Sequence, residues 1–207
     1  MKILHVDASI LGQYSMSRQL TASIVDKLRK TNKHAEVIYR DLVAAPPAHM
    51  TLATLPGDHP SAAMAGPLDS AAQSIRDDSQ KMLDEFLAAN TVVIGVPMYN
   101  FGIPTQLKAW VDMIVVPGKT FTYSPNGAVG LMGKKRAIVA ITRGAAYGPE
   151  SPFAAGEHAE SYMHAVLSFL GITHSEFVIA EGTMAGGEEG RKKARESAQA
   201  MIEQLVA

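Results

Sequence analysis

The 207-residue chain contains no cysteine. It can therefore form no disulfide, offer no thiolate nucleophile and build no cysteine metal site. Its 19 Lys and Arg residues nearly balance its 20 Asp and Glu residues, which argues against general binding to nucleic acids or anionic membranes. No stretch reaches the roughly 20 apolar residues of a membrane span, and no long apolar run precedes the first polar loop as in a signal peptide. These absences predict a soluble cytoplasmic protein without a metal, membrane or nucleic-acid partner.

The composition is ordinary for one globular domain. Hydrophobic residues make up 47% of the chain and charged residues 19%. At this length a folded chain buries roughly 70% of the surface that it exposes when unfolded, so one core is sufficient. We therefore expect a single domain over residues 1–207.

Strand-like and helix-like segments alternate along the chain. Short apolar runs predict strands, and apolar residues at helical spacing predict the helices between them. The expected strands are 2–6, 35–39, 91–96, 136–142 and 172–180, and the expected helices are 17–30, 69–89, 104–114, 155–170 and 188–206. The third strand is apolar throughout, which is typical of the centre of a parallel sheet. The alternation predicts an α/β fold, a doubly wound five-stranded parallel sheet with helices on both faces.

Two segments interrupt this alternation. Residues 41–68 contain five prolines and are too long for an idle connection, and loops of this kind often form lids or dimer arms. Their apolar residues Met50, Leu52 and Leu55 are hard to bury in one core, so we expect them to help form a symmetric dimer. Residues 121–127 predict a strand followed by a turn at Asn-Gly.

A loop rich in hydroxyl groups follows the first strand. Ser9, Ser15 and Ser17 surround the predicted start of a helix near Met16. A helix start presents unpaired N–H groups and the positive end of the helix dipole, and serine hydroxyls can add neutral donors. This arrangement suits a phosphate monoester without any lysine. The alternative interpretation is that Ser15 or Ser17 only caps the helix.

Two more loops follow predicted parallel strands and are expected at the same sheet edge. Residues 97–104 can offer backbone N–H groups to ring atoms and side chains that sandwich a flat ring. Residues 142–145 can direct a cation and backbone groups at the pyrimidine end of a flavin. The alternatives are a loop that caps the core and a surface turn, respectively. The residues expected to contact the heterocycle are Pro97, Met98, Tyr99, Asn100, Phe101, Thr142, Arg143, Gly144 and Ala145.

With these loops in view, the chain resembles the FMN-dependent NADH:azoreductase family over essentially its whole length. Ser9 with 15–17 matches the family's phosphate loop, and 97–101 followed by 106–110 matches its most specific motif. Residues 121–123 with 126–127 match a further segment, and 142–145 stand where the family often has Ser-Arg-Gly-Gly, with alanine replacing the last glycine.

This resemblance implies a flavodoxin-like fold, bound FMN, and NADH or NADPH as electron donor. It also implies a ping-pong mechanism with azo, quinone or nitroaromatic acceptors, in a homodimer whose second subunit completes each active site. Ser9, Ser15, Met16 and Ser17 would hold the phosphate of FMN, and Tyr123 would contact the substrate.

Three functions remain open from the sequence. The first is the flavin-dependent reductase, the second is an electron carrier like flavodoxin, and the third is a flavin-free binding or regulatory protein. Carriers of that type are usually shorter and strongly acidic, so the neutral charge and the long segment 41–68 favour the reductase. Hydride transfer to a flavin needs stacking and orientation more than a protein acid or base, and we predict no catalytic residue.

Overall fold

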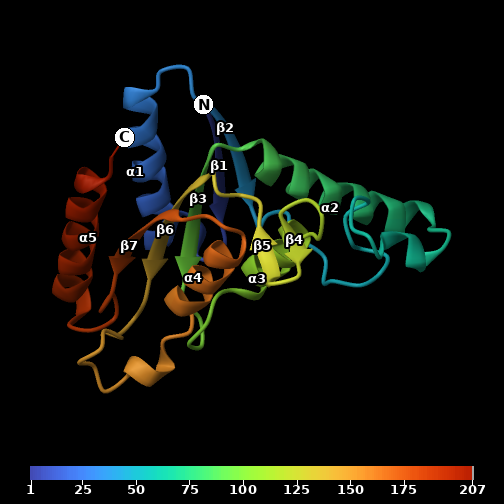
Figure 1. Cartoon of the computed structure of the whole chain (residues 1–207). Helices are drawn as coiled ribbons and strands as arrows, with labels where there is room; N and C mark the ends of the chain where they lie inside the picture. Colours follow the sequence, from blue (N-terminus) through green and yellow to red (C-terminus); the bar gives the residue numbers. More distant parts are fainter. Residues whose placement is uncertain (207) are drawn as a thin grey trace.

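A central sheet of parallel strands organises the computed structural model, which describes residues 1–206. Its strands are β1 (Lys2–Asp7), β2 (Glu36–Asp41), β3 (Thr91–Pro97), β6 (Arg136–Thr142) and β7 (His174–Ala180). They lie in the order β2-β1-β3-β6-β7, and each neighbouring pair is parallel (Figure 1). The predicted five-stranded, doubly wound α/β fold is confirmed.

Helices cover both faces of this sheet (Figure 1). In the described part of the chain the α-helices are α1 (Met16–Thr31), α2 (Ser70–Ala88), α3 (Thr105–Ile114), α4 (Glu160–Phe169) and α5 (Gly187–Gln204). Buried residues of α1 and α5 form one core with one face of the sheet, and those of α2, α3 and α4 form a second core with the other face. Short 3-10 turns occur at η1 (Gly12–Tyr14), η2 (Ala62–Ala65) and η3 (Ala154–Gly156).

The hydrophobic pattern explains this layering. All seven residues of β3 are buried, because the strand lies between β1 and β6 with helices over both faces. In α1 the residues Leu20, Ile24 and Leu28 recur at every fourth position and are buried on the face that meets the sheet. On the opposite face Trp110 is almost fully buried.

Helix α4 begins later than the sequence predicts. The expected helix over 155–170 is replaced by the turn η3 and then by α4, which starts at Glu160. The carboxylate of Glu157 accepts hydrogen bonds from the backbone N–H groups of Ala159, Glu160 and Ser161. These bonds satisfy donors that have no partner within the helix, so Glu157 sets where α4 begins.

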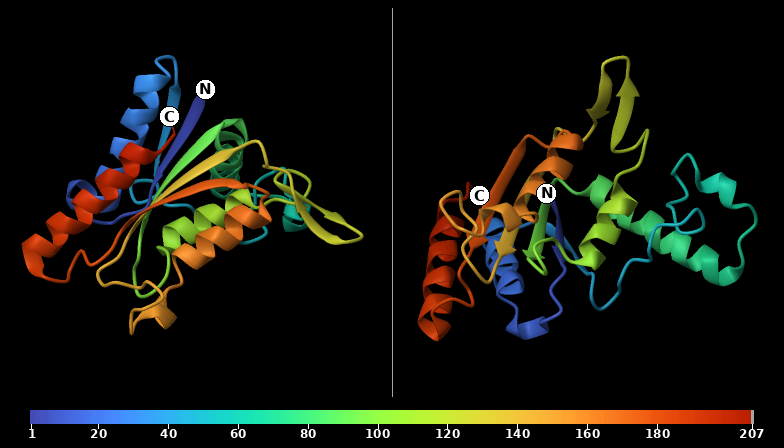
Figure 2. Two further views of the ribbon diagram at one scale, coloured as in Figure 1. Left: turned by 60° about the vertical axis from the view of Figure 1, so that its left-hand side comes forward. Right: turned by 90° about the horizontal axis from the view of Figure 1, so that it is seen from below.

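A two-stranded hairpin projects from the body of the molecule, as Figure 2 shows. Strands β4 (Phe121–Ser124) and β5 (Gly127–Gly130) are antiparallel, and Ser124 pairs with Gly127. The turn is therefore formed by Pro125 and Asn126, and the predicted turn at Asn126-Gly127 is wrong by one residue. The ring of Pro125 presets φ for the first position of such a turn, and Gly127 adopts a φ of 113° as it begins β5.

The segment between β2 and α2, here called the arm (residues 42–69), lies along the N-terminal half of α2, away from the sheet (Figure 1). The Arg76 guanidinium of α2 donates hydrogen bonds to the backbone carbonyls of Leu52, Ala53 and Ala62, which holds the arm in place. Leu55 is buried within the chain, contrary to the sequence-based expectation that it would be hard to bury. No helix within residues 1–206 has the length and apolar composition needed to cross a membrane.

Candidate functional site

A cleft of about 220 Å³ opens at the carboxyl edge of the sheet, where the loops after β1, β3, β6 and β7 meet. Eight of the predicted site residues line it: Ser9, Ser15, Met16, Pro97, Met98, Tyr99, Thr142 and Gly144. Five residues that sequence reasoning did not select also line it: Leu11, Tyr14, Thr183, Met184 and Arg191. The predicted residues Ser17, Asn100, Phe101, Arg143, Ala145 and Tyr123 are not among the lining residues.

The loop after β1, here called the hydroxyl loop (residues 9–17), forms one end of the cleft. Ser15 is the N-cap of α1, and its Oγ accepts a hydrogen bond from the backbone N–H of Arg18 at 3.3 Å. The Ser17 Oγ lies 3.0 Å from the Ser15 Oγ and is fully buried. Ser15 thus stands between the cleft and Ser17. The first turn of α1 carries no acidic residue, so its positive dipole end is not neutralised there.

Tyr99 ties the loop after β3 to the hydroxyl loop. Its hydroxyl oxygen lies 3.2 Å from Ser9 Oγ and accepts a hydrogen bond from the backbone N–H of Ile10 at 3.2 Å. The backbone of Tyr99 also exchanges two hydrogen bonds with Gly102, which places Asn100 and Phe101 at the tip of a tight turn. These two residues have φ values of 49° and 75°, which are rare for residues with side chains. Neither residue lines the cleft, and the ring of Phe101 lies near Gly156 instead.

Arg143 is buried among three carboxylates. Its guanidinium nitrogens lie 3.5 Å from Glu157, 3.1 Å from Glu160 and 3.2 Å from Glu181. Burial opposes ionisation of Glu157, but the hydrogen bonds that it accepts outweigh this effect and lower the pKa of its carboxyl. The Arg143 side chain is thus paired with these acids and does not line the cleft, whereas its neighbour Gly144 does.

Backbone hydrogen bonds join the loops after β6 and β7. The N–H of Thr183 donates to the Arg143 carbonyl at 3.2 Å, and that of Met184 donates to the Gly144 carbonyl at 3.0 Å. These bonds bring Thr183 and Met184 to the cleft. Because they follow the last parallel strand closely, the rule that ligands bind beyond strand ends could have identified them.

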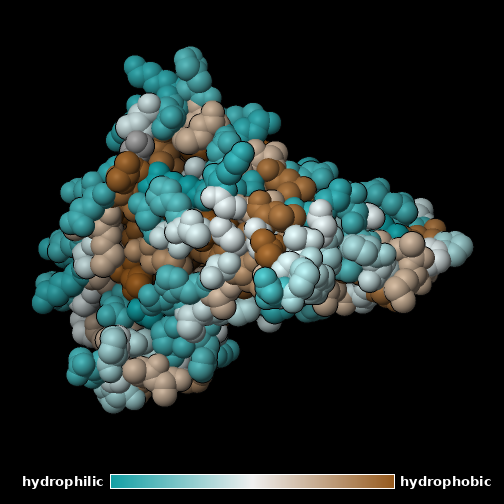
Figure 3. Space-filling model, viewed as in Figure 1, coloured by the Kyte–Doolittle hydropathy of each residue, from teal (hydrophilic) through white to brown (hydrophobic). Residues whose placement is uncertain are grey.

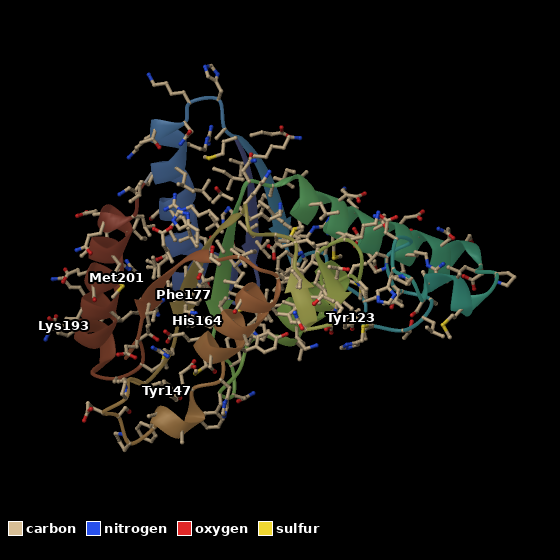
Figure 4. The ribbon with its side chains drawn as sticks, in the orientation of Figure 1. Tyr123, Tyr147, His164, Phe177, Lys193 and Met201 are labelled. Carbon is tan, nitrogen blue, oxygen red and sulfur yellow. The ribbon has the colours of Figure 1, made fainter. Side chains whose placement is uncertain are left out.

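Tyr123 lies on the projecting hairpin. Its side chain is 74% exposed and packs edge-on against Phe121, with ring centroids 5.3 Å apart. Figure 4 shows Tyr123 over the hairpin, well separated from Tyr147 in the loop after β6. The structure therefore does not bring Tyr123 to the cleft of its own chain.

A polar network supports the hydroxyl loop from behind. The Arg18 guanidinium donates to the Ser9 carbonyl through Nε at 3.1 Å and Nη2 at 2.8 Å, and it pairs with Asp41 at 2.6 and 2.7 Å. The hydrogen bond from Arg18 lowers the pKa of the Asp41 carboxyl. Tyr39 donates to the buried Asp7, and burial together with that carboxylate raises the pKa of Tyr39 to about 12. The charge of Arg18 is thus neutralised locally.

The lining of the cleft suits binding and orientation of a ligand. Hydroxyl and N–H donors at the start of α1 can hold an anion, while Pro97, Met98 and Met184 offer apolar surface to a flat ring. The lining residues within the described chain include no carboxylate and no imidazole. The arrangement therefore suits the binding of a flat molecule that carries an anionic group.

Comparison with known proteins identifies close relatives. A Methylobacterium radiotolerans protein named FMN-dependent NADH:quinone oxidoreductase is 56% identical over 207 residues, which cover 100% of both chains. A protein of the same name from Xanthomonas campestris pv. campestris is 50% identical over 208 residues, covering 99% of each chain.

Solved structures give the same result at lower identity. An azoreductase from Bacillus anthracis superposes with a TM-score of 0.83 at 28% identity, covering 99% of this chain and 96% of that one. The fold also matches an FMN-dependent NADH-azoreductase from the same organism, solved in complex with FMN, with a TM-score of 0.84 at 24% identity and coverage of 100% and 99%. Residues 1–206 match the model of a family described by its flavodoxin-like fold. The predicted resemblance is confirmed, and the chain belongs to this flavodoxin-like family.

Proposed function

We propose that the protein is an FMN-dependent oxidoreductase of the cytoplasm that passes electrons from NADH to quinones and azo compounds. The observation that carries this proposal is the cleft itself, in which a donor-rich helix start adjoins an apolar wall. Strong support comes from a relative of 56% identity, covered along its whole length, that is named FMN-dependent NADH:quinone oxidoreductase.

The phosphate of FMN fits the hydroxyl loop. The Ser15 Oγ accepts a hydrogen bond from the backbone N–H of Arg18 and can accept a second one from the Ser17 hydroxyl. The hydroxyl hydrogen of Ser15 is then available to donate a hydrogen bond to a phosphate oxygen. Ser9 and the first backbone N–H groups of α1, including that of Met16, supply further donors. In this assignment Ser15 contacts the phosphate directly and Ser17 acts through it.

The flavin ring fits the other walls of the cleft. Pro97, Met98 and Tyr99 provide the surface on which it lies, and Thr142 and Gly144 flank its edge. Asn100, Phe101, Arg143 and Ala145 shape these two loops from outside the lining. When bound, FMN accepts a hydride from NADH and returns two electrons to the acceptor.

NADH and the acceptor are proposed to occupy one position in turn. The bound ring would be covered on one side by the protein, and Met184, a residue of the cleft lining, is 79% exposed. NAD⁺ therefore leaves before the acceptor enters, as in a ping-pong mechanism. A quinone takes up two electrons and two protons to become a hydroquinone. An azo compound takes up four electrons and four protons to give two amines, so each dye molecule consumes two NADH.

A symmetric homodimer is proposed to complete the site. Met50, Leu52 and Met64 of the arm are 56%, 45% and 73% exposed. Figure 3 shows a second group of apolar side chains gathered around the hairpin, where Val129 of β5 is exposed, and Phe169 at the end of α4 is also exposed. A second copy would cover such surfaces through one self-complementary interface. Because Tyr123 lies apart from the cleft of its own chain, its proposed contact with substrate requires this dimer.

Steady-state kinetics test the proposed reaction. Initial rates are measured with NADH and benzoquinone, and separately with NADH and an azo dye, at several fixed concentrations of each acceptor. We expect parallel double-reciprocal lines, inhibition by excess acceptor, and two NADH oxidised per azo bond cleaved.

The alternatives give different results. An electron carrier would bind FMN but reduce no quinone with NADH alone, and a flavin-free binding protein would yield a folded, colourless preparation that takes up no FMN. Intersecting lines, together with detection of a complex holding NADH and acceptor at once, would contradict the shared position only. Light scattering that reports a fully active monomer would contradict the dimer.

A further inference from the structure

Arg191 is the one cationic residue among those that line the cleft within the described chain. We propose that Arg191 binds the phosphate of FMN and supplies the positive charge that the hydroxyl loop lacks. This inference rests on the proposed function, because it assigns a further residue to the same binding site.

The fold brings Arg191 to the phosphate end of the cleft. Helices α1 and α5 lie side by side on one face of the sheet, and both begin at its carboxyl edge (Figures 1 and 2). The Arg191 Nη2 donates a hydrogen bond to the backbone carbonyl of Tyr14 at 3.0 Å. Tyr14 directly precedes Ser15, the N-cap of α1. The guanidinium is therefore held next to the proposed phosphate donors.

The positive charge at the start of α1 is too small to balance the negative charge of a bound phosphate. A phosphate monoester carries a charge of about −1.5 to −2 near neutral pH, whereas a helix start offers only about half a positive charge. The serine hydroxyls are neutral, and the guanidinium of Arg18 is already paired with Asp41. Arg191 is thus the cation of the cleft lining that can balance the remaining charge.

The Arg191 guanidinium has N–H groups that remain available to bind a ligand. Among residues 1–206 its guanidinium makes this one hydrogen bond and no ion pair, while the nearby Glu189 is paired with Lys193. A planar guanidinium with two donor edges can bind the carbonyl of Tyr14 on one side and a phosphate oxygen on another. The residue is only partly buried and its hydrogen bond to Tyr14 is exposed to solvent, so salt should screen its contact with a phosphate.

Arg195 provides a matched control. It lies one turn further along α5 and lines a neighbouring hollow of about 680 Å³ between η1 and α5, which shares Tyr14 and Arg191 with the cleft, but Arg195 itself does not line the cleft. Replacing Arg195 therefore makes the same chemical change on the same helix without altering the cleft lining.

Two flavins separate phosphate recognition from other effects, because riboflavin lacks only the phosphate of FMN. We would titrate flavin-free protein with each, following the quenching of flavin fluorescence. Arg191→Gln should weaken FMN binding by about 10- to 150-fold, as expected for a hydrogen bond to a charged group. Riboflavin binding should not change, and Arg191→Lys should restore part of the FMN affinity. The FMN affinity of the Gln variant should also depend less on salt, whereas Arg195→Gln should behave like the unaltered protein.

The opposite results are equally clear. Unchanged FMN affinity in Arg191→Gln would show that Arg191 does not contact the phosphate. Equal losses for FMN and riboflavin would show that it acts only by holding the Tyr14 backbone. If circular dichroism shows that the Gln variant does not fold, the ratio of FMN to riboflavin affinity in Arg191→Lys decides the matter, and an unaltered ratio overturns the proposal. Failure of the unaltered protein to bind any flavin would instead overturn the proposed function.

Discussion

The two serines at the start of α1 allow the phosphate site to be separated from helix capping. Ser15 both caps α1 and lines the cleft, whereas Ser17 is fully buried and contacts the Ser15 hydroxyl at 3.0 Å. Ser15→Ala removes the cap and a phosphate donor together. Ser17→Ala leaves the cap and the Ser15 hydroxyl in place. The two variants should therefore differ in a defined way.

The expected magnitudes follow from these contacts. Loss of the Ser15 cap should lower the free energy of unfolding of the apo-protein by about 1 kcal/mol, which corresponds to a melting temperature lower by about 2–4 °C for a chain of this length. Loss of a hydrogen bond to a charged phosphate should weaken FMN binding by about 10- to 150-fold. Ser17→Ala loses one hydrogen bond between neutral groups, so FMN affinity should fall by about 5-fold or less.

Thermal unfolding of the apo-protein and fluorescence titration with FMN measure the two effects independently. Ser15→Thr retains a hydroxyl group that can cap α1 and serves as the control, and its FMN affinity should stay well above that of Ser15→Ala. A larger loss of FMN affinity in Ser17→Ala than in Ser15→Ala would refute the assignment of Ser15 as the direct donor. Intact FMN affinity in Ser15→Ala would show that Ser15 is only a cap.

Three further substitutions test the scaffold behind the site. Arg18 lowers the pKa of the Asp41 carboxyl, so their pairing stabilises the fold above the unfolded-state pKa of about 3.9. This stabilisation is lost as the pH falls through the lower folded-state pKa. Asp41→Asn should therefore make the free energy of unfolding depend less on pH in the acidic range. Gly95→Ala would place a Cβ atom 2.6 Å from the buried Asp7 carboxylate and should cost about 1–3 kcal/mol in denaturant unfolding. Trp110→Ala should cost about 3–5 kcal/mol, measured by circular dichroism.

Local patterns account for the part of the fold that the sequence predicts. The strand over 91–96 is recognisable because no polar side chain follows Thr91 in it, and α1 because its apolar residues recur at helical spacing. The start of α4 is not recognisable in this way, since a glutamate side chain three residues before Glu160 decides it through hydrogen bonds. Periodicity says little about such caps.

In the site, too, local sequence patterns predict some features and miss those that depend on contacts between distant residues. Placing loops at the ends of parallel strands predicts where the cleft lies and most of its lining. It does not predict that Arg143 is enclosed by carboxylates, because Glu181 lies 38 positions further along the chain. Nor does it predict Arg191, which comes from the last helix and contacts the backbone of Tyr14, 177 positions away. Contacts of this kind depend on how the helices pack against the sheet.

The most direct test of the central claim is an anaerobic rapid-mixing experiment on protein reconstituted with FMN. NADH is added first without any acceptor, and the flavin absorbance near 450 nm is followed before a quinone is added in a second mixing step. We predict that NADH alone bleaches the flavin, with about one NADH consumed per FMN, and that the quinone then restores the absorbance fully. A flavin that stays oxidised with excess NADH, or a preparation that takes up no FMN, would contradict this prediction.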